Sequence, residues 1–417
     1  MNDYELIIEI LNNVYSGKNL TDEINKYKSN INISRIKYIV YGVIRNYYLI
    51  DFCIHKIVKH VSKTNKIIIQ IGIYELNNSN KPHYAVVNTL VEIVDNGKEK
   101  KFINWVLREY QRQKENLSIL IIKDYSLKYN IPNWMIDLLK KQYKNNYLKF
   151  LDGLNYHPAF GLRVNYIKKS LDEYIEILKQ SNIKYIINED NKICLEKSLD
   201  IKDVPLFLDG VSSIQDVAAQ YTVNLLTKNN ITPVKVLDAC AAPGGKTCQI
   251  LENYNCSLTA MDISSHRLER IKQNLQRLEL KAKIIIGDAF NLDWWDKSKF
   301  DLIIADVPCS ASGTIKRNPD IKINRSYDDV IKFTVSQRKI VLNLWNCLED
   351  NGYLLYITCS IFRDENQDNI AWFKDNIKGF KLIDELQIIP TEYNDSLYYA
   401  LVQKNNRTYA LTADMVL

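Results

Sequence analysis

The chain has 417 residues, 46% of them hydrophobic and 25% charged, with a formal net charge of +6. This length predicts two or three domains, and the absence of a run of about 18 apolar residues excludes a membrane span. The acidic start, Met1-Asn2-Asp3-Tyr4-Glu5, is unlike a secretory or transit signal, and the eight cysteines contain no C-x-x-C pair. We therefore expect a cytoplasmic protein with reduced thiols, no disulfide framework and no metal.

The charge is distributed unevenly along the chain. Residues 1–150 carry a net charge of roughly +9 and the remainder about −3. A basic first part beside a nearly neutral remainder favours a polyanionic partner held by the first part. A lysine-rich solvated surface would give the same count, so charge alone leaves both interpretations open.

Residues 1–125 are predicted to form a helical first domain. Its run Ile67–Ile73 fits either a buried strand or a core helix, and the helical pattern on both sides favours the helix. Further helices are expected over 82–94 and 102–113. Apolar residues recur at helical spacing in two earlier segments, namely Tyr4, Ile7, Ile8, Leu11, Val14 and Tyr15, and Ile36, Ile39, Val40, Val43, Ile44 and Tyr47.

Residues 126–205 are predicted to form linker helices and a small α/β module. A turn at Ile131-Pro132 leads into an amphipathic helix, and the later pattern predicts strand, helix, strand, strand over 162–165, 171–180, 184–187 and 192–195. The module is too small to fold convincingly alone, so we expect it to pack on the region C-terminal to it, as a lid or an RNA platform.

Residues 206–417 alternate strands and helices, which is typical of a doubly wound, Rossmann-like sheet. Helices are expected between the strands, for example over 265–278 and 333–348. The predicted strands are 234–237, 258–261, 282–286, 302–305, 353–357 and 397–403.

The first strand of this region ends in a turn that suits a nucleotide-like ligand. The stretch from Asp238 to Thr247 nearly matches the phosphate-binding pattern G-x-x-x-x-G-K-[ST], but Cys240 stands where the first glycine belongs. An acid directly after the strand, Asp238, suits an ammonium group better than a triphosphate. S-adenosylmethionine carries such a group.

Four acids follow four predicted strands. They are Asp238, Asp262, Asp288 and Asp306. In such sheets ligands bind at the carboxyl ends of the strands, where Asp262 is expected to grip ribose hydroxyls and Asp288 to meet the adenine amino group. One such acid often just caps a helix, but four behind a Gly-Gly turn favour an adenosyl ligand. G-x-G-x-x-G is absent, which argues against a dinucleotide.

Two cysteines, Cys309 and Cys359, follow predicted strand ends beside the expected methyl donor. A free cysteine is often only a small buried hydrophobe, and Cys248 and Cys347 are interpreted so. A thiolate would be useful at this place, because attack at C6 of a pyrimidine makes C5 able to accept a methyl group. Since an ordinary thiol is mostly protonated at pH 7, the site needs a positive charge or a proton acceptor, and Lys246, Lys316 and Arg317 are the nearest candidates.

Three phrases in the first domain resemble the helical RNA-binding domain named for the antitermination factor NusB. They are Tyr41-Gly-Val-Ile-Arg-Asn46, His83-Tyr-Ala-Val-Val-Asn88 and Phe102-Ile-Asn-Trp-Val-Leu-Arg108. The later motifs Cys240-Ala-Ala-Pro-Gly-Gly-Lys246, Asp306-Val-Pro-Cys-Ser310 and Thr358-Cys-Ser360 resemble those of the RNA cytosine-C5 methyltransferases. Together the two resemblances span nearly the whole chain and imply a bacterial enzyme acting on 16S ribosomal RNA.

The resemblance also implies roles for individual residues. Cys359 would be the nucleophile at C6 and Cys309 would assist release of the adduct, whereas DNA cytosine methyltransferases use the Pro-Cys thiol as nucleophile. Asp306 would in addition hydrogen-bond the target base. The implied S-adenosylmethionine site comprises Cys240, Ala241, Ala242, Pro243, Gly244, Gly245, Lys246, Asp262, Asp288 and Asp306.

Some segments depart from the family pattern. Lys316-Arg317-Asn318 stands where relatives usually have Arg-Arg-His, and Asp395-Ser-Leu-Tyr-Tyr-Ala400 replaces the usual Asp-Gly-Phe-Phe-Tyr-Ala. The tail after Lys404 is longer than the family pattern predicts.

The expected enzyme is a monomer that methylates a single-stranded or looped cytosine of 16S rRNA. A base in a duplex would have to be extruded at a cost of a few kcal/mol. A tRNA cytosine-C5 methyltransferase, a non-catalytic RNA-binding or ribosome-assembly factor, and a protein or small-molecule methyltransferase are the alternatives. The NusB-like front argues against the first, and the paired thiols argue against the other two.

Overall fold

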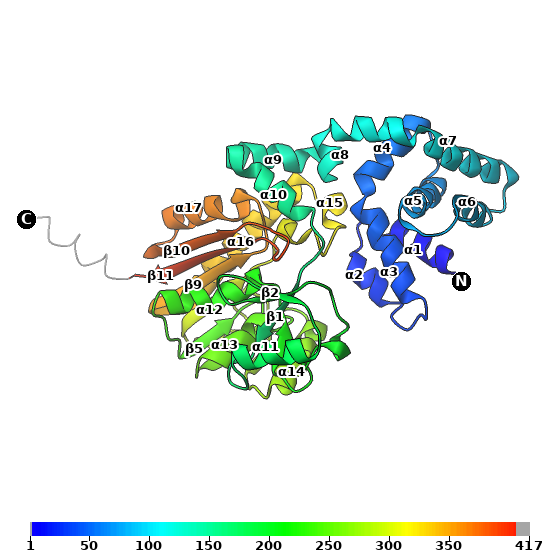
Figure 1. The fold of residues 1–417 in the computed structure, drawn as a ribbon. Helices are drawn as coiled ribbons and strands as arrows, with labels where there is room; N and C mark the ends of the chain where they lie inside the picture. The colour runs from blue at the N-terminus through cyan, green and yellow to red at the C-terminus, as the bar shows by residue number, and fades with distance from the viewer. Residues whose placement is uncertain (1, 406–417) are drawn as a thin grey trace, which may run out of the picture. The chain divides into compact units, whose positions relative to one another are not determined.

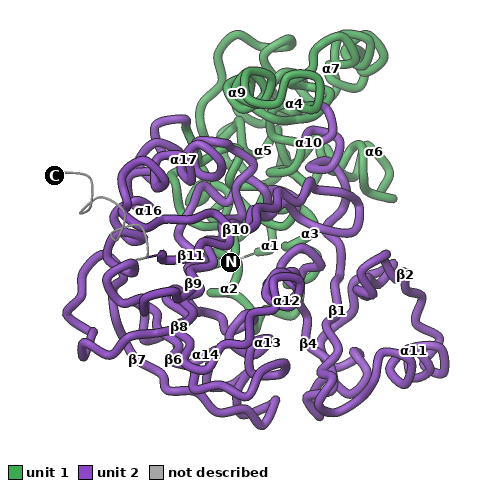
Figure 2. Tube along the Cα trace, turned by 90° about the vertical axis from the view of Figure 1, so that its left-hand side faces the viewer, with its two compact units in different colours: residues 1–147, 317–326 green, residues 148–316, 327–417 purple. Residues whose placement is uncertain are grey.

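The computed structural model describes residues 2–405, so the tail after Lys404 lies almost entirely outside the described residues. The chain forms two compact units (Figure 2). Unit 1 consists of Met1–Tyr147 and Arg317–Ser326, and unit 2 of Leu148–Lys316 and Tyr327–Leu417. The predicted domains 1–125, 126–205 and 206–417 concern which parts of the chain fold independently, and they stay a prediction.

Unit 1 is helical, as predicted. Its central helix α5 (Lys63–Asn78) contacts five other helices of the unit, which explains why every residue of the mostly apolar run Ile67–Ile73 is buried. The choice of a helix for this run is confirmed. The remaining helices are α1 (Asp3–Tyr15), α2 (Leu20–Asn25), α3 (Ile33–Arg45), α4 (Tyr47–Ile57), α6 (His83–Val91), α7 (Gly97–Ile122), α8 (Tyr125–Tyr129) and α9 (Asn133–Tyr143).

Ten residues from the second half of the chain, Arg317–Ser326, belong to unit 1 and contain the short helix α15 (Ile321–Asn324). Lys322 is buried there, where its ammonium donates to the carbonyl oxygen of Arg45 and, at 2.9 Å, to that of Asn130. Burial, and then the charge of Arg45, lower the pKa of Lys322 to about 7. Tyr48 donates its hydroxyl to the Lys322 carbonyl at 2.7 Å. A segment that directly follows the Cys309 loop in sequence is therefore a structural part of the helical unit.

Unit 2 contains a small antiparallel sheet in the order β2-β3-β1-β4. The predicted strand-helix-strand-strand order is confirmed. The fourth strand, β4, was not predicted, since it is three residues long and follows a stretch of turns. The elements are α10 (Tyr147–Leu154), β1 (Phe160–Val164), α11 (Leu171–Gln180), β2 (Tyr185–Ile187), β3 (Ile193–Leu195) and β4 (Ser212–Ile214).

The larger sheet of unit 2 has seven strands in the order β10-β11-β9-β8-β5-β6-β7. The five strands from β9 to β7 are parallel, and β11 and β10 add antiparallel pairs at one edge. All six predicted strands are present and the Rossmann-like class is confirmed; β10, with a mixed polar sequence, was not predicted. The strands are β5 (Lys235–Asp238), β6 (Ser257–Asp262), β7 (Lys283–Ile286), β8 (Phe300–Asp306), β9 (Leu348–Thr358), β10 (Phe380–Ile388) and β11 (Leu397–Lys404).

Alternating residues of these strands build two cores, one on each face of the sheet. Val236 packs with residues of α12, α13 and α14, whereas its neighbour Leu237 packs with residues of α16 and α17. Figure 1 shows the two groups of helices on opposite faces of the strands. The helices are α12 (Tyr221–Lys228), α13 (Gly245–Asn253), α14 (Ser265–Leu278), α16 (Tyr327–Cys347) and α17 (Gln367–Asn376). Because β5, β6, β8 and β9 are parallel, the acids and cysteines that follow them meet at one edge.

Candidate active site

The two predicted cysteines meet directly. β8 and β9 are parallel neighbours, with Asp306 opposite Ile357, and the loops after them place the sulfur atoms of Cys309 and Cys359 3.4 Å apart. Both thiols are free and partly exposed. The hydrogen bond with Cys359, followed by burial, raises the pKa of Cys309 well above its ordinary value of 9.0. The two side chains are therefore within hydrogen-bond distance of each other.

A buried carboxylate that sequence reasoning missed, Glu365, joins the two cysteine loops. It lies in a 3-10 turn (Arg363–Glu365) and accepts from the Ser310 amide at 2.8 Å and from the hydroxyls of Ser310 and Ser360 at 2.5 Å each. Gln337 of α16 donates to it at 3.0 Å. Burial raises the pKa of Glu365 against the opposing effect of these donors. Each cysteine is thus followed by a serine tied to the same carboxylate.

A cavity of about 340 Å³ opens beside the two thiols. This volume is within the range of small-molecule sites. Carboxylates from three strand ends line it together with both sulfur atoms. Seven of the predicted site residues are among its walls, namely Cys240, Ala242, Asp262, Asp288, Asp306, Cys309 and Cys359.

The turn between β5 and α13 supplies one wall of the cavity. Gly244 has a φ of +99°, a conformation that favours glycine. Asp262 is buried and accepts from the amides of Ala242 and Ser264, each at 3.2 Å. The other predicted turn residues do not line the cavity, namely Ala241, Pro243, Gly244, Gly245 and Lys246.

The three predicted sources of positive charge lie in different environments. Lys246 pairs with Asp306 at 2.6 Å. Burial lowers the pKa of Lys246, but Asp306, Tyr399 and Asp238 together raise it above the ordinary value. Lys316 is buried and donates to the carbonyl oxygens of Thr391 and Asn394 at 2.7 Å each. Arg317 belongs to unit 1. The Lys316 ammonium is therefore bound to the loop that contains Thr391 and Asn394. The prediction that Lys316 supplies positive charge to a thiol is wrong.

Asp238, the acid expected to meet an ammonium group, lies beneath the turn. It is 1% exposed, accepts from the Thr247 hydroxyl at 2.6 Å, and is absent from the cavity walls. Its second carboxylate oxygen has no hydrogen-bond donor among the described residues. Burial, the largest cause, raises the pKa of Asp238 from 3.8 to about 7.

We expect the stability of the protein to depend on pH because of the buried side chain of Asp238. The pKa of Asp238 is higher in the folded than in the unfolded protein, so folding takes up a proton on Asp238 between about pH 4 and 7. The stability that this protonation contributes is lost as the pH rises through that window. Asp238→Asn removes the titration, so its melting temperature should exceed that of the wild type by a few degrees more at pH 8 than at pH 5. Thermal melts of both proteins at the two pH values measure this, and an equal difference at both would contradict it.

Arg163 of β1 ties the small sheet to the turn that carries the cavity wall. Its guanidinium donates to both oxygens of Glu252 at 2.9 and 2.8 Å, to the Gly245 carbonyl at 2.9 Å, and to Gln215. Both members of the ion pair are almost fully buried. The small module is thereby packed on the seven-stranded sheet and its helices, as expected.

Replacing Arg163 by lysine should weaken this link without removing the charge. Lysine cannot reproduce the fork of donors, so we expect a loss of about 1–3 kcal/mol in unfolding free energy and weaker binding of S-adenosylmethionine. Urea denaturation and calorimetric titration measure the two effects. Arg270→Lys, on the exposed face of α14, is the matched control, and equal behaviour of the two variants would refute the role of Arg163.

Within residues 2–405, no helix is both long and apolar enough to cross a membrane. Nor do the described side chains include a group of three or more His, Cys, Asp or Glu arranged to hold a metal ion.

Comparison with known proteins agrees with this architecture. The family described as 16S rRNA methyltransferase RsmB/F matches residues 223–405, the NusB family matches 1–112, and the ferredoxin-like domain of RsmF/B-like methyltransferases matches 131–202. A solved structure of PH0851 is 22% identical with a TM-score of 0.74 and covers 97% of this chain and 99% of its own. NSun6 from Pyrococcus horikoshii with SFG is 19% identical with a TM-score of 0.58, over 66% of this chain and 98% of that one. These two show the fold.

Curated relatives show the family. Ribosomal RNA small subunit methyltransferase B of Shewanella oneidensis is 38% identical over 87% of this chain and 89% of its own length. The protein of the same name from Proteus mirabilis is 32% identical over 95% and 96%. With its cavity, its NusB-like unit and these relatives, the chain belongs to the RsmB/F family of S-adenosylmethionine-dependent rRNA methyltransferases, among the small subunit methyltransferases B.

Proposed function

We propose that this protein methylates C5 of a cytosine in 16S rRNA through a covalent bond between Cys359 and C6. The observation that carries the proposal is the pair of sulfur atoms 3.4 Å apart on the wall of a cavity that Asp262 and Asp288 also line. A methyltransferase acting on an oxygen or an amino group would need no thiol, because those atoms are nucleophilic themselves. A pyrimidine C5 is not, and needs covalent activation.

The cavity fits the methyl donor by its volume and its acids. Asp262 and Asp288, at the ends of β6 and β7, would hold the ribose hydroxyls and the adenine amino group, as carboxylates do in such sheets. Asp306, at the end of β8, lies between this part and the thiols and is paired with Lys246. S-adenosylmethionine supplies an electrophilic methyl group when bound. The other turn residues would shape the site through their backbone.

Cys359 starts the reaction on the base. Its thiolate attacks C6, an Sγ–C6 bond forms, and the electrons of the C5–C6 double bond become available at C5 for the methyl group. The resemblance to the RNA cytosine-C5 methyltransferases, in which the Thr-Cys thiol attacks C6, supports the assignment of Cys359 as the nucleophile.

Cys309 then assists release of the methylated base from Cys359. As the Sγ–C6 bond breaks, the Cys309 thiol can pass its proton to the leaving Cys359 sulfur across 3.4 Å. The resulting Cys309 thiolate takes the proton from C5, and the electrons of that C–H bond restore the C5–C6 double bond. Both cysteines end as thiols, and the proton from C5 remains on the protein until Cys359 ionises again.

The RNA is expected to be single-stranded at the target, because C6 must be reached by a sulfur atom. The basic first part of the chain would hold RNA through phosphates, so binding should weaken steeply with salt.

Methyl transfer from S-adenosylmethionine carrying a labelled methyl group to unmodified 16S rRNA tests the proposal. Digestion to nucleosides should place the label in 5-methylcytidine. Label in another nucleoside would refute C5 chemistry, and label in tRNA alone would refute the substrate assignment. Failure of the purified protein to bind S-adenosylmethionine would favour a non-catalytic RNA-binding factor instead.

A further inference from the structure

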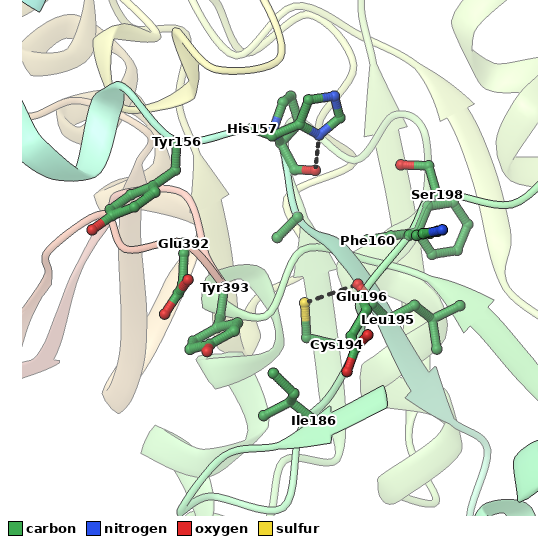
Figure 3. A pocket seen from close by; sticks show the side chains of 13 residues that line it. Tyr156, His157, Phe160, Ile186, Cys194, Leu195, Glu196, Ser198, Glu392 and Tyr393 are labelled. Carbon is green, nitrogen blue, oxygen red and sulfur yellow. Dashed lines mark hydrogen bonds between the residues drawn. The ribbon is translucent and has the colours of Figure 1, made fainter. Parts of the chain in front are cut away.

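Unit 2 has a second, larger cavity of about 530 Å³ that the proposed chemistry does not use. It lies between the small sheet and the loop that joins β10 to β11. Figure 3 shows Tyr156, Glu392 and Tyr393 on one side and Cys194, Leu195, Glu196 and Phe160 on the other. None of the residues around this pocket also lines the cavity beside the two thiols.

A short chain of backbone hydrogen bonds connects the loop between β10 and β11 with the backbone of Cys359. The Gly313 amide donates to the Cys359 carbonyl at 2.8 Å, and the Ser396 amide donates to the Gly313 carbonyl at 3.1 Å. Lys316 binds the carbonyl oxygens of Thr391 and Asn394, on both sides of Glu392 and Tyr393. The loop that supplies one wall of the pocket is therefore fixed to the loop that follows Cys309.

The walls combine aromatic rings with hydrogen-bond acceptors. Tyr156 is 49% exposed, and Phe160 and Tyr393 are partly exposed, so their rings are available for stacking. Glu196 and Glu392 are exposed and line the pocket, together with the exposed side chains of Lys197 and His157. Among the described residues no hydrogen bond or ion pair engages the Glu196 carboxylate. Glu392 raises the pKa of Tyr393, first through a hydrogen bond with its hydroxyl.

The carboxylates and aromatic rings of these walls determine which kind of ligand the pocket can bind. The carboxylates of Glu196 and Glu392 outnumber the one lysine of the lining, Lys197, and a carboxylate only accepts hydrogen bonds, so the pocket disfavours a phosphate and favours a ligand with N–H donors. Single-stranded RNA is commonly read by stacking bases on aromatic side chains and by bonding their Watson–Crick edges. Among the bases, guanine presents two adjacent N–H donors on that edge, which one carboxylate can accept together.

We propose that the pocket between Tyr156, Glu196 and Tyr393 binds an unstacked guanine of the substrate RNA close to the target cytosine. This inference rests on the proposed function, since it takes single-stranded RNA as the substrate, and it adds a determinant of which cytosine is chosen. Stacking on the aromatic side chains supplies affinity, and Glu196 supplies the preference for guanine.

Equilibrium binding of the full chain to fluorescein-labelled decamers tests the proposal. One decamer is oligouridine with a central cytosine flanked by guanosines, and the second has adenosines in place of the guanosines. The wild type should bind the first about tenfold more tightly, in the range expected of a bidentate contact to a base. Glu196→Gln, which keeps shape but adds a donor, should bring that ratio close to one.

Aromatic variants test the stacking separately. Tyr393→Leu should weaken binding of both decamers by roughly tenfold or more. Tyr166→Leu, at a tyrosine of the same small module that is 53% exposed and outside the pocket, is the matched control and should bind as the wild type does. Thermal melting of each variant verifies its folding, and Glu196→Gln affects only an exposed side chain.

The outcomes separate this inference from the proposed function. A wild-type ratio near one, or unchanged binding by both Glu196→Gln and Tyr393→Leu, overturns the guanine pocket even if the wild type makes 5-methylcytidine in 16S rRNA. Absence of methyl transfer by the wild type overturns the proposed function, whatever the decamers show.

Discussion

Replacing Cys359 by serine is expected to abolish methyl transfer to 16S rRNA, with a fall in turnover of at least about a thousandfold. A serine hydroxyl is far less acidic than a thiol and cannot supply an anion for attack at C6. The side chain is nearly isosteric, so folding and binding of S-adenosylmethionine should persist. Initial rates with a labelled methyl donor, together with calorimetric titration of the donor, measure both.

The variant Cys309→Ala should fail at the later step, release of the adduct. With Cys309→Ala the Sγ–C6 bond can form but the proton exchange that breaks it is lost, so a protein–RNA adduct should accumulate and survive denaturing electrophoresis. Cys256→Ser, at a partly exposed cysteine away from the cavity walls, is the control and should behave as wild type. An active Cys359→Ser protein with an inactive, adduct-free Cys309→Ala protein would show that the two roles are reversed.

Glu365→Ala is expected to produce the largest effect of any residue that does not touch the reacting atoms. The carboxylate accepts four hydrogen bonds from Ser310, Ser360 and Gln337, all buried. Removing it deprives these buried donors of their shared acceptor, which should cost about 3–5 kcal/mol of unfolding free energy and release the two cysteine loops from one another. Urea denaturation measures the first effect, and turnover well below the melting temperature measures the second.

Glu365→Gln distinguishes positioning of the thiols from mere loss of stability. The amide retains one acceptor but turns a donor toward other donors, so we expect a smaller loss of stability and still a clear fall in kcat. The KM for S-adenosylmethionine should stay unchanged, because Glu365 is not among the walls of the cavity. A variant with normal kcat at a temperature where it is folded would contradict the positioning role.

The site could be predicted from the sequence where its residues follow strands directly. Asp262, Asp306, Cys309 and Cys359 each come at or just after a strand of a parallel sheet, and such a sheet brings its carboxyl ends to one edge whatever the details of packing. That topology follows from the alternation of apolar runs and helical patterns, so local signals were sufficient for it.

Other features depend on contacts that no local pattern encodes. Glu365 lies in a short turn, and only the meeting of three distant segments reveals its role. Asp238 follows its strand like the other acids, yet it lies beneath the turn, because side chains alternate between faces and the helix start covers it. The incorporation of Arg317–Ser326 into the helical unit requires contacts between residues some 200 to 300 positions apart.

Bisulfite mapping of 16S rRNA, from cells with and without this protein, tests the central claim most directly. We predict one cytosine that resists conversion in the presence of the wild type, converts fully in the deletion strain, and regains resistance on complementation with the wild type but not with Cys359→Ser. An unchanged 16S map, or loss of 5-methylcytosine from tRNA alone, would contradict the assignment of this chain as a 16S rRNA cytosine-C5 methyltransferase.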